Sequence, residues 1–183
     1  AINRLGLIYE NQGKPDLAIK EYEKGIALET ANPLSAAYCY SNRAKIYTKQ
    51  TLLDKALLDY TKAIELDPEN GDRYYNRALF FQDFQKDNNK ALLDFSKAIE
   101  LDPENIDYLY NRGRYYQYYS LDEKSAIKDF EQMLKINPAD VDAINSIGVI
   151  YESQGKADLA IKEYEKGIAL ETTNPEAAAY CYS

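Results

Sequence analysis

The feature that most constrains the fold of this 183-residue chain is that the chain repeats itself. The segments KALLDYTKAIELDPEN (residues 55–70) and KALLDFSKAIELDPEN (residues 90–105) agree at 14 of 16 positions. An alanine at a fixed place in each copy recurs at intervals of 38, 35, 35 and 34 residues: Ala18, Ala56, Ala91, Ala126 and Ala160. A repeat at this period predicts a stacked array in which each unit contacts only its neighbours.

Each copy contains two amphipathic segments of roughly 12–15 residues whose apolar positions recur about every 3.6 residues, which predicts a pair of helices. The first segment carries a small residue followed by an aromatic one: LGLIY (5–9), RAKIY (43–47), RALFF (77–81), RGRYY (112–116) and IGVIY (147–151). The second carries the alanine and then another ring. Small residues facing large rings allow two helices to approach closely. We expect the second helices to end at Pro33, Pro68, Pro103, Pro138 and Pro175, because proline cannot donate within a helix.

These landmarks resemble the tetratricopeptide repeat family, whose pattern is a bulky residue, L-G-x2-Y, A-x3-F and then Pro within about 34 residues. The resemblance covers the whole chain, with five copies in register. It implies an all-α fold, a right-handed α-solenoid (superhelix) of stacked antiparallel helix-turn-helix hairpins. We place one solenoid over residues 1–183, with repeats at about 1–33, 34–68, 69–103, 104–138 and 139–175 and the start of a sixth at 176–183.

A longer period lies above the hairpin. Residues 1–41 and 143–183 match at 33 of 41 positions, at an offset of 142. Four hairpins therefore form a module that begins again at Ala143, and the irregular ends ETANP and ETTNP are copied with it. The third and fourth hairpin turns are each one residue longer than the others. Neither end has the polar cap that solenoids need for solubility, so we expect end-to-end self-association through the terminal helices.

The resemblance implies that the first helices line a concave groove. Asn42, Asn76 and Asn111 recur there at one position of three successive hairpins. An amide offers both a donor and an acceptor, so a ladder of amides could hold the backbone of an extended peptide. The alternative is that each Asn bonds to a neighbouring helix. Further candidate peptide-binding residues on this face are Lys45, Tyr75, Tyr110 and Arg114, although packing between helices would also explain the tyrosines.

Arginines recur on the first helices (Arg43, Arg77 and Arg112), and aspartates recur on the second helices (Asp59, Asp94 and Asp129). We interpret the two rows as ion pairs rather than as an anion site. Exposed pairs of this kind contribute only ~0–1 kcal/mol each. A clamp for chaperone C-termini, known in this family, would keep only Asn42 of its residues here, so we do not expect that activity.

Composition argues against several functions. The net charge of −8 disfavours nucleic-acid binding, and no apolar stretch reaches the ~18 residues of a membrane span. The chain has no His and no phosphate-binding or metalloprotease motif, so we expect no enzyme activity, no cofactor and no metal. The spacing of Cys39 and Cys181 favours reduced thiols over a disulfide or a zinc site. The absence of a signal pattern favours the cytoplasm, without fixing the compartment.

The leading functional hypothesis is a protein–protein interaction scaffold that holds an extended peptide or a helix of a partner protein in its groove. The recurring Asn residues support this hypothesis. The alternative is an architectural spacer that stacks on itself within a long multi-module protein, and the near-identity of the two module starts supports this second hypothesis.

Overall fold

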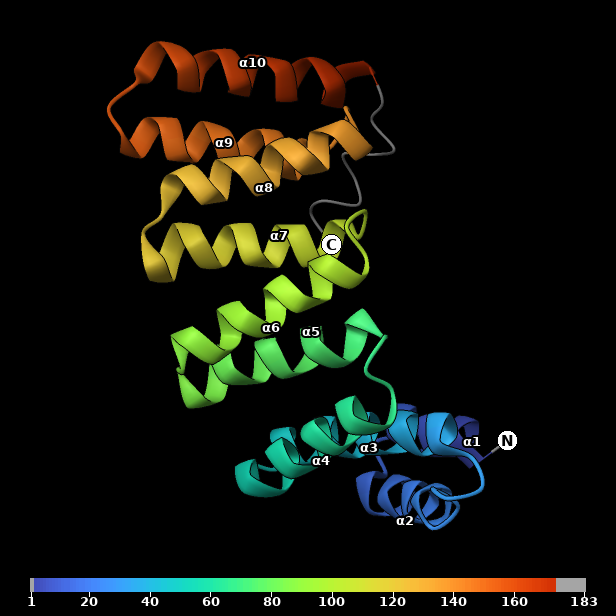
Figure 1. The fold of residues 1–183 in the computed structure, drawn as a ribbon. Helices are drawn as coiled ribbons and strands as arrows, with labels where there is room; N and C mark the ends of the chain where they lie inside the picture. Colours follow the sequence, from blue (N-terminus) through green and yellow to red (C-terminus); the bar gives the residue numbers. More distant parts are fainter. Residues whose placement is uncertain (1, 174–183) are drawn as a thin grey trace. The chain divides into compact units, whose positions relative to one another are not determined.

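The computed structural model describes the backbone of residues 2–173 and the side chains of residues 2–170. Within that range the chain folds into five antiparallel helical hairpins and contains no strand (Figure 1). The hairpins are α1 (Ile2–Asn11) with α2 (Pro15–Ile26), α3 (Pro33–Lys49) with α4 (Leu53–Leu66), α5 (Gly71–Phe80) with α6 (Asn88–Leu101), α7 (Ile106–Tyr115) with α8 (Glu123–Ile136), and α9 (Val141–Ser153) with α10 (Ala157–Thr173). The predicted all-α hairpin architecture is confirmed.

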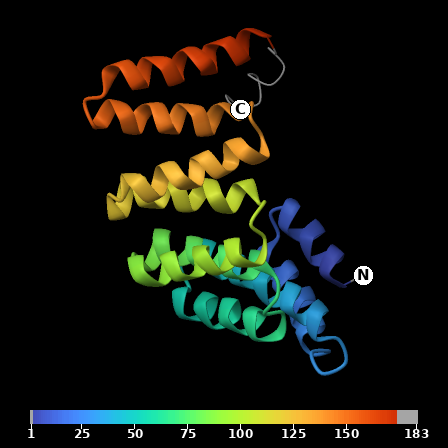
Figure 2. The ribbon, with the colours of Figure 1, turned by 45° about the horizontal axis from the view of Figure 1, so that its top comes forward.

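The helices group into two compact units. Unit 1 (Ala1–Asp102) holds α1 to α6, and unit 2 (Pro103–Ser183) holds α7 to α10. In unit 1 each helix packs against the next along the chain, from α1 to α6, and the same is true in unit 2 from α7 to α10. Within each unit, therefore, the second helix of a hairpin lies against the first helix of the hairpin that follows (Figure 2).

Small residues on the first helices allow each hairpin to close tightly. A Cβ atom added at Gly113 would lie 2.8 Å from Cε1 of Phe130, and one added at Gly148 would lie 2.6 Å from Cε1 of Tyr164. The ring of Tyr22 occupies the same place opposite Gly6. A larger residue on the first helix would collide with these rings, so the small-residue pattern of the sequence reports a real constraint of packing.

The recurring arginines and aspartates pair within each of the three middle hairpins. Arg43, Arg77 and Arg112 each place Nε at 2.7–2.8 Å from Oδ2 of the facing aspartate and donate a second bond from Nη2. The predicted pairing is confirmed, but the expected exposure is wrong. Asp59, Asp94 and Asp129 are only 3%, 6% and 4% exposed. Desolvation offsets much of the attraction in such a buried pair, but loss of one partner would leave a buried charge without compensation and would cost more than loss of a surface pair.

The longer turns of the third and fourth hairpins take the form of π-helical segments. α5 continues into η1 (Phe81–Gln85), and α7 continues into η2 (Tyr116–Ser120). Each segment ends in a residue with left-handed backbone geometry, Lys86 at φ 52° and Leu121 at φ 53°. A π-turn widens the helix by one residue, so it absorbs the inserted residue without shifting the second helix.

The predicted role of proline holds for three of the four described helix ends. α4, α6 and α8 end two residues before Pro68, Pro103 and Pro138. The prediction for Pro33 is wrong, because α2 already ends at Ile26 and Pro33 is the first residue of α3. The first helical position tolerates proline, since its N–H would have no helical partner. The fifth residue of this set, Pro175, lies outside the described residues.

Replacing Gly113 with Ala should lower the free energy of unfolding by about 1–3 kcal/mol, because the new methyl group would overlap the Phe130 ring. Chemical denaturation monitored by circular dichroism would measure the change. An alanine in place of a helical glycine ordinarily stabilises a helix by about 0.5–1 kcal/mol. A more stable Gly113→Ala variant would therefore contradict the close approach of α7 and α8.

Candidate peptide-binding face

Polar side chains connect the first helices of unit 1 to one another. Asn42 on α3 donates from Nδ2 to Oδ1 of Asn3 on α1, at 2.9 Å. Arg73 on α5 donates from Nη1 to the Oγ of Ser41 on α3, at 3.3 Å. The three helices α1, α3 and α5 thus lie side by side. We call the surface that carries Asn3, Asn42, Lys45, Asp72 and Asn76 the first-helix face.

Lys45 is the exposed cation of the first-helix face. Solvent reaches its side chain, but enough protein surrounds it that desolvation lowers the pKa of its ammonium group. Asp72 and Glu10 act in the opposite direction on this pKa, as nearby negative charges. Arg73 and Lys49, as nearby positive charges, lower this pKa further, so the two carboxylates offset only part of the effect.

Arg73 fixes the geometry of this face and was missed by the sequence analysis. It is 3% exposed, its Nε and Nη2 lie 3.3 and 3.2 Å from Oδ2 of Asp67, and its guanidinium lies 4.1 Å from the centre of the Tyr38 ring. One signal was available in the sequence. In the neighbouring repeats the same position holds Cys39 and Tyr108, so Arg73 is the charged exception at a position of uncharged residues.

The three predicted Asn residues do not play one common role. Asn42 bridges two helices, as the alternative interpretation expected. Asn76 and Asn111 instead donate from Nδ2 to a backbone carbonyl of their own helix, at 2.7 Å to Asp72 and 2.9 Å to Asp107. Asn42 and Asn76 lie in unit 1 and Asn111 lies in unit 2.

The predicted tyrosines take part in packing inside their own hairpins. The half-buried Tyr75 ring lies 6.1 Å from the ring of Phe95, and Tyr110 lies 6.2 Å from Phe130, both in tilted geometry. Arg114 is exposed on α7, with its guanidinium 5.6 Å from the centre of the Tyr110 ring. The structure thus brings Asn42, Lys45 and Asn76 onto one face of unit 1, and places Tyr110 and Arg114 together in unit 2.

The described residues offer neither a metal site nor a membrane span. Among them, no group of three or more His, Cys, Asp or Glu side chains could hold a metal ion. No helix within residues 2–173 is both long enough and apolar enough to cross a membrane. Cys39 is a free thiol that is fully buried, and Cys181 lies outside the described residues.

Hairpins that repeat at about 35 residues and stack second helix on first helix define a helical-repeat protein. Models of the tetratricopeptide repeat match residues 1–32, 37–70, 72–105 and 141–174. The chain therefore belongs to the tetratricopeptide repeat family, whose members are in general scaffolds for protein interactions. The fourth hairpin falls outside the matched residues, although α7 and α8 form the same structure there.

Comparison with solved structures supports the same class. The chain is similar to MamA, with 27% sequence identity and a TM-score of 0.75 over 93% of this chain and 96% of that one. A tetratricopeptide repeat protein from Parabacteroides merdae has 24% identity and a TM-score of 0.77, over 95% and 66%. YrrB, described as a TPR protein with an unusual peptide-binding site, has 20% identity and a TM-score of 0.70, over 100% and 91%. No curated protein matches. The fold is an all-α solenoid.

Replacing Arg73 with Lys should lower the free energy of unfolding of the chain by about 1–3 kcal/mol, because a single ammonium group cannot bond Asp67 and Ser41 and also stack on Tyr38. Thermal and chemical denaturation would measure the loss. The matched control is Arg114→Lys, an exposed position that should change stability by no more than about 0.5 kcal/mol. Equal effects at the two positions would contradict the anchoring role of Arg73.

Proposed function

We propose that the first-helix face of unit 1 binds an extended, acidic peptide of a partner protein. The observation that carries this proposal is the position of Lys45, an exposed cation flanked by the amides of Asn42 and Asn76 on adjacent helices. The general scaffold role of the family supports it. So does the peptide-binding site named for YrrB, a relative of the same fold.

The charge of the face favours a carboxylate as the ligand group. Desolvation and the positive charges of Arg73 and Lys49 lower the pKa of the Lys45 ammonium group, and the carboxylates of Asp72 and Glu10 offset only part of that effect. A peptide carboxylate placed beside Lys45 would form a charge-assisted hydrogen bond, which is stronger than a hydrogen bond between neutral groups.

The amides on either side would position the peptide backbone. The Nδ2 groups of Asn42 and Asn76 already donate within the protein, and this fixes the orientation of both amides. An oriented amide binds a peptide with less loss of side-chain entropy than a mobile one. Arg73 holds α5 against α3 from below the face, so the spacing between the two amides is also fixed.

A second candidate function, self-association of near-identical modules, rests on a different observation. Residues 1–41 and 143–183 match at 33 of 41 positions, so nearly the same hairpin sequence recurs along the chain.

An array of synthetic extended peptides, each acidic peptide paired with its Asn/Gln counterpart, would test the peptide proposal on the full chain. We expect the acidic peptides to bind and their amide counterparts to bind at least about tenfold more weakly. Lys45→Glu should weaken binding of the acidic peptides by a similar factor, as measured by fluorescence anisotropy.

The matched control for this experiment is Lys20→Glu, which makes the same charge change at an exposed position on the second helix α2. It should leave binding unchanged apart from long-range screening effects. If both variants lose affinity equally, the attraction is a property of net charge and not of the first-helix face. If neither variant changes binding, the proposed role of Lys45 is wrong.

A further inference from the structure

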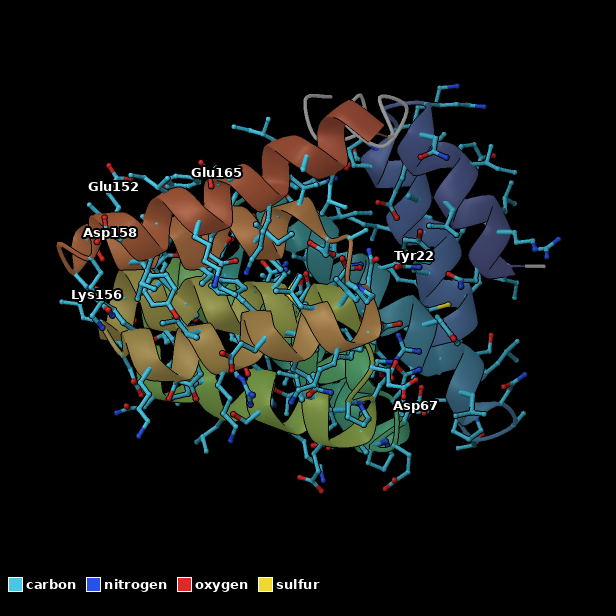
Figure 3. The ribbon with its side chains drawn as sticks, turned by 90° about the horizontal axis from the view of Figure 1, so that it is seen from above. Tyr22, Asp67, Glu152, Lys156, Asp158 and Glu165 are labelled. Carbon is cyan, nitrogen blue, oxygen red and sulfur yellow. The ribbon has the colours of Figure 1, made fainter. Side chains whose placement is uncertain are left out.

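The ends of the α7–α8 and α9–α10 hairpins enclose a hollow on the surface of unit 2, with a volume of about 940 Å³. One wall is the start of α8 with the turn before it, and the other wall is the end of α9 with the turn after it. Lys156, labelled in Figure 3, lies in this second turn. From there α10 runs for 17 residues, or roughly 25 Å, so its far end does not shape the hollow.

Leu121 lines the hollow and is unfavourable for the fold in two ways. Its side chain is 76% exposed, and its backbone is left-handed at φ 53°, where a bulky side chain crowds the main chain. At the equivalent position the other four turns hold glycine or a polar residue: Gly13, Thr51, Lys86 and Gly155. Glycine adopts this geometry without strain, so folding does not require a leucine here.

The carbonyl oxygen of Gln154 is a second unfavourable feature of the same lining. The Nε2 group of Gln154 donates to Oε2 of Glu123, at 2.8 Å. Because a carboxylate only accepts hydrogen bonds, this contact fixes which side of the amide carries the oxygen. That oxygen, Oε1, is buried and accepts no hydrogen bond from the described part of the chain. A buried acceptor without a donor destabilises the fold.

The first hairpin shows a bond that this oxygen could form. Gln12 and Lys14 are the equivalents of Gln154 and Lys156, 142 residues earlier in the chain. There Nζ of Lys14 donates to Oε1 of Gln12, at 2.9 Å. In the fifth hairpin Nζ of Lys156 lies instead over the ring of Tyr151, 5.8 Å from its centre. The oxygen of Gln154 thus lacks the donor that its equivalent has.

The charged residues of the hollow favour a ligand that carries an anionic group. Three lysines line it and form no ion pair with a described carboxylate: Lys124, Lys128 and Lys156. Two of the three carboxylates in the lining are already engaged. Glu123 accepts from Ser153 and Gln154, and Asp122 accepts from the backbone N–H and the hydroxyl of Ser125. The ammonium groups are therefore more available to a ligand than these two carboxylates are.

We propose that this hollow binds a short segment of a partner protein in which a large apolar side chain stands next to an Asp or Glu residue. Leu121 and the half-buried Ile127 and Tyr151 would contact the apolar side chain. The lysines would bind the neighbouring carboxylate. A backbone N–H of the segment would donate to Oε1 of Gln154 after a small outward movement of that side chain. One ligand would then satisfy every feature of the hollow that the fold leaves unfavourable.

A peptide fits these requirements better than a ligand rich in phosphate does. The oxygen of Gln154 needs a donor, whereas phosphate groups offer chiefly acceptors. The carboxylates of Asp122, Glu123 and Glu131 in the lining would also repel a ligand with many negative charges. A peptide carries N–H donors, a carboxylate and an apolar side chain within a few residues. The proposal does not rest on the first-helix face, which belongs to unit 1.

Fluorescence anisotropy of the full chain with short synthetic peptides would test the proposal. The peptides would carry Leu or Phe beside Asp or Glu. Each would be paired with one counterpart that has Ala in place of the apolar residue and another that has Asn or Gln in place of the acidic residue. We expect the parent peptides to bind and both counterparts to bind at least about tenfold more weakly.

Two substitutions with matched controls would locate the site. Leu121→Gly should weaken binding at least about tenfold without lowering the midpoint of thermal unfolding, because glycine adopts positive φ without strain. Lys86→Gly, at the same turn position of the third hairpin, should leave binding unchanged. Lys128→Glu should also weaken binding, whereas Lys162→Glu, at the equivalent position of α10, should change it only through long-range charge effects.

Binding that is lost in Leu121→Gly and Lys128→Glu but kept in both controls would support the proposal. It is wrong if no parent peptide binds, or if the Ala counterparts bind as tightly as their parents, which would indicate a simple anion site. Affinity that is lost in Lys45→Glu but kept in Leu121→Gly would place the peptide on the first-helix face of unit 1. That result would overturn the present proposal and support the earlier one, so the two are tested separately.

Discussion

The close packing of a small residue on each first helix against a ring on the second helix is the contact on which the rest of the structure depends. Because Gly113 and Gly148 have no side chain, the rings of Phe130 and Tyr164 can lie directly on the helix backbone. One side of the first helix is therefore packed closely against the second helix of the same hairpin. The opposite side of the first helix carries the polar residues, and in unit 1 these form a continuous surface.

Buried ion pairs reinforce the same contact in the three middle hairpins. Each pair joins a first helix to its own second helix, so it sets the hairpin rather than the stacking of hairpins. Arg73 acts differently, because it joins two successive first helices through Ser41. The face that we propose for peptide binding is therefore held by a contact that depends on Arg73, because the equivalent positions of the neighbouring repeats hold Cys39 and Tyr108.

Much of the fold could be predicted from the sequence because repetition aligns equivalent residues. Residues that recur at equivalent positions of successive repeats predict the hairpins, the contact between small residues and aromatic rings, and the Arg–Asp pairs. The burial of Asp59 and its equivalents did not follow, because exposure depends on how the hairpins stack. The end of α2 was also missed, since Pro33 permits two roles and only the cap at Asn32, which accepts from the backbone N–H of Ser35, selects one.

The candidate site was predicted less completely than the fold. Alignment of the repeats identified Asn42, Lys45 and Asn76 by their recurring positions. Equivalent positions in a sequence do not reveal hydrogen bonds, so the different partners of Asn42 and Asn76 could not be predicted. The tyrosines illustrate the same limit, because Tyr75 sits on a first helix yet turns its ring toward Phe95. Arg73, in contrast, differs from the residues at the equivalent positions of the other repeats. In a repeat protein, a residue that departs from its equivalents indicates a site better than one that recurs.

The claim that the first helices of unit 1 form the recognition surface can be tested most directly by nuclear magnetic resonance. The chain, labelled with ¹⁵N, would be titrated with an acidic peptide that binds it. The account predicts the largest shifts for the side-chain amides of Asn42 and Asn76 and for the backbone around Lys45. The second helices α4 and α6 expose Leu58 and Leu93, each 71% accessible. Shifts centred on those two leucines, with the amides of the first-helix face unchanged, would contradict the account.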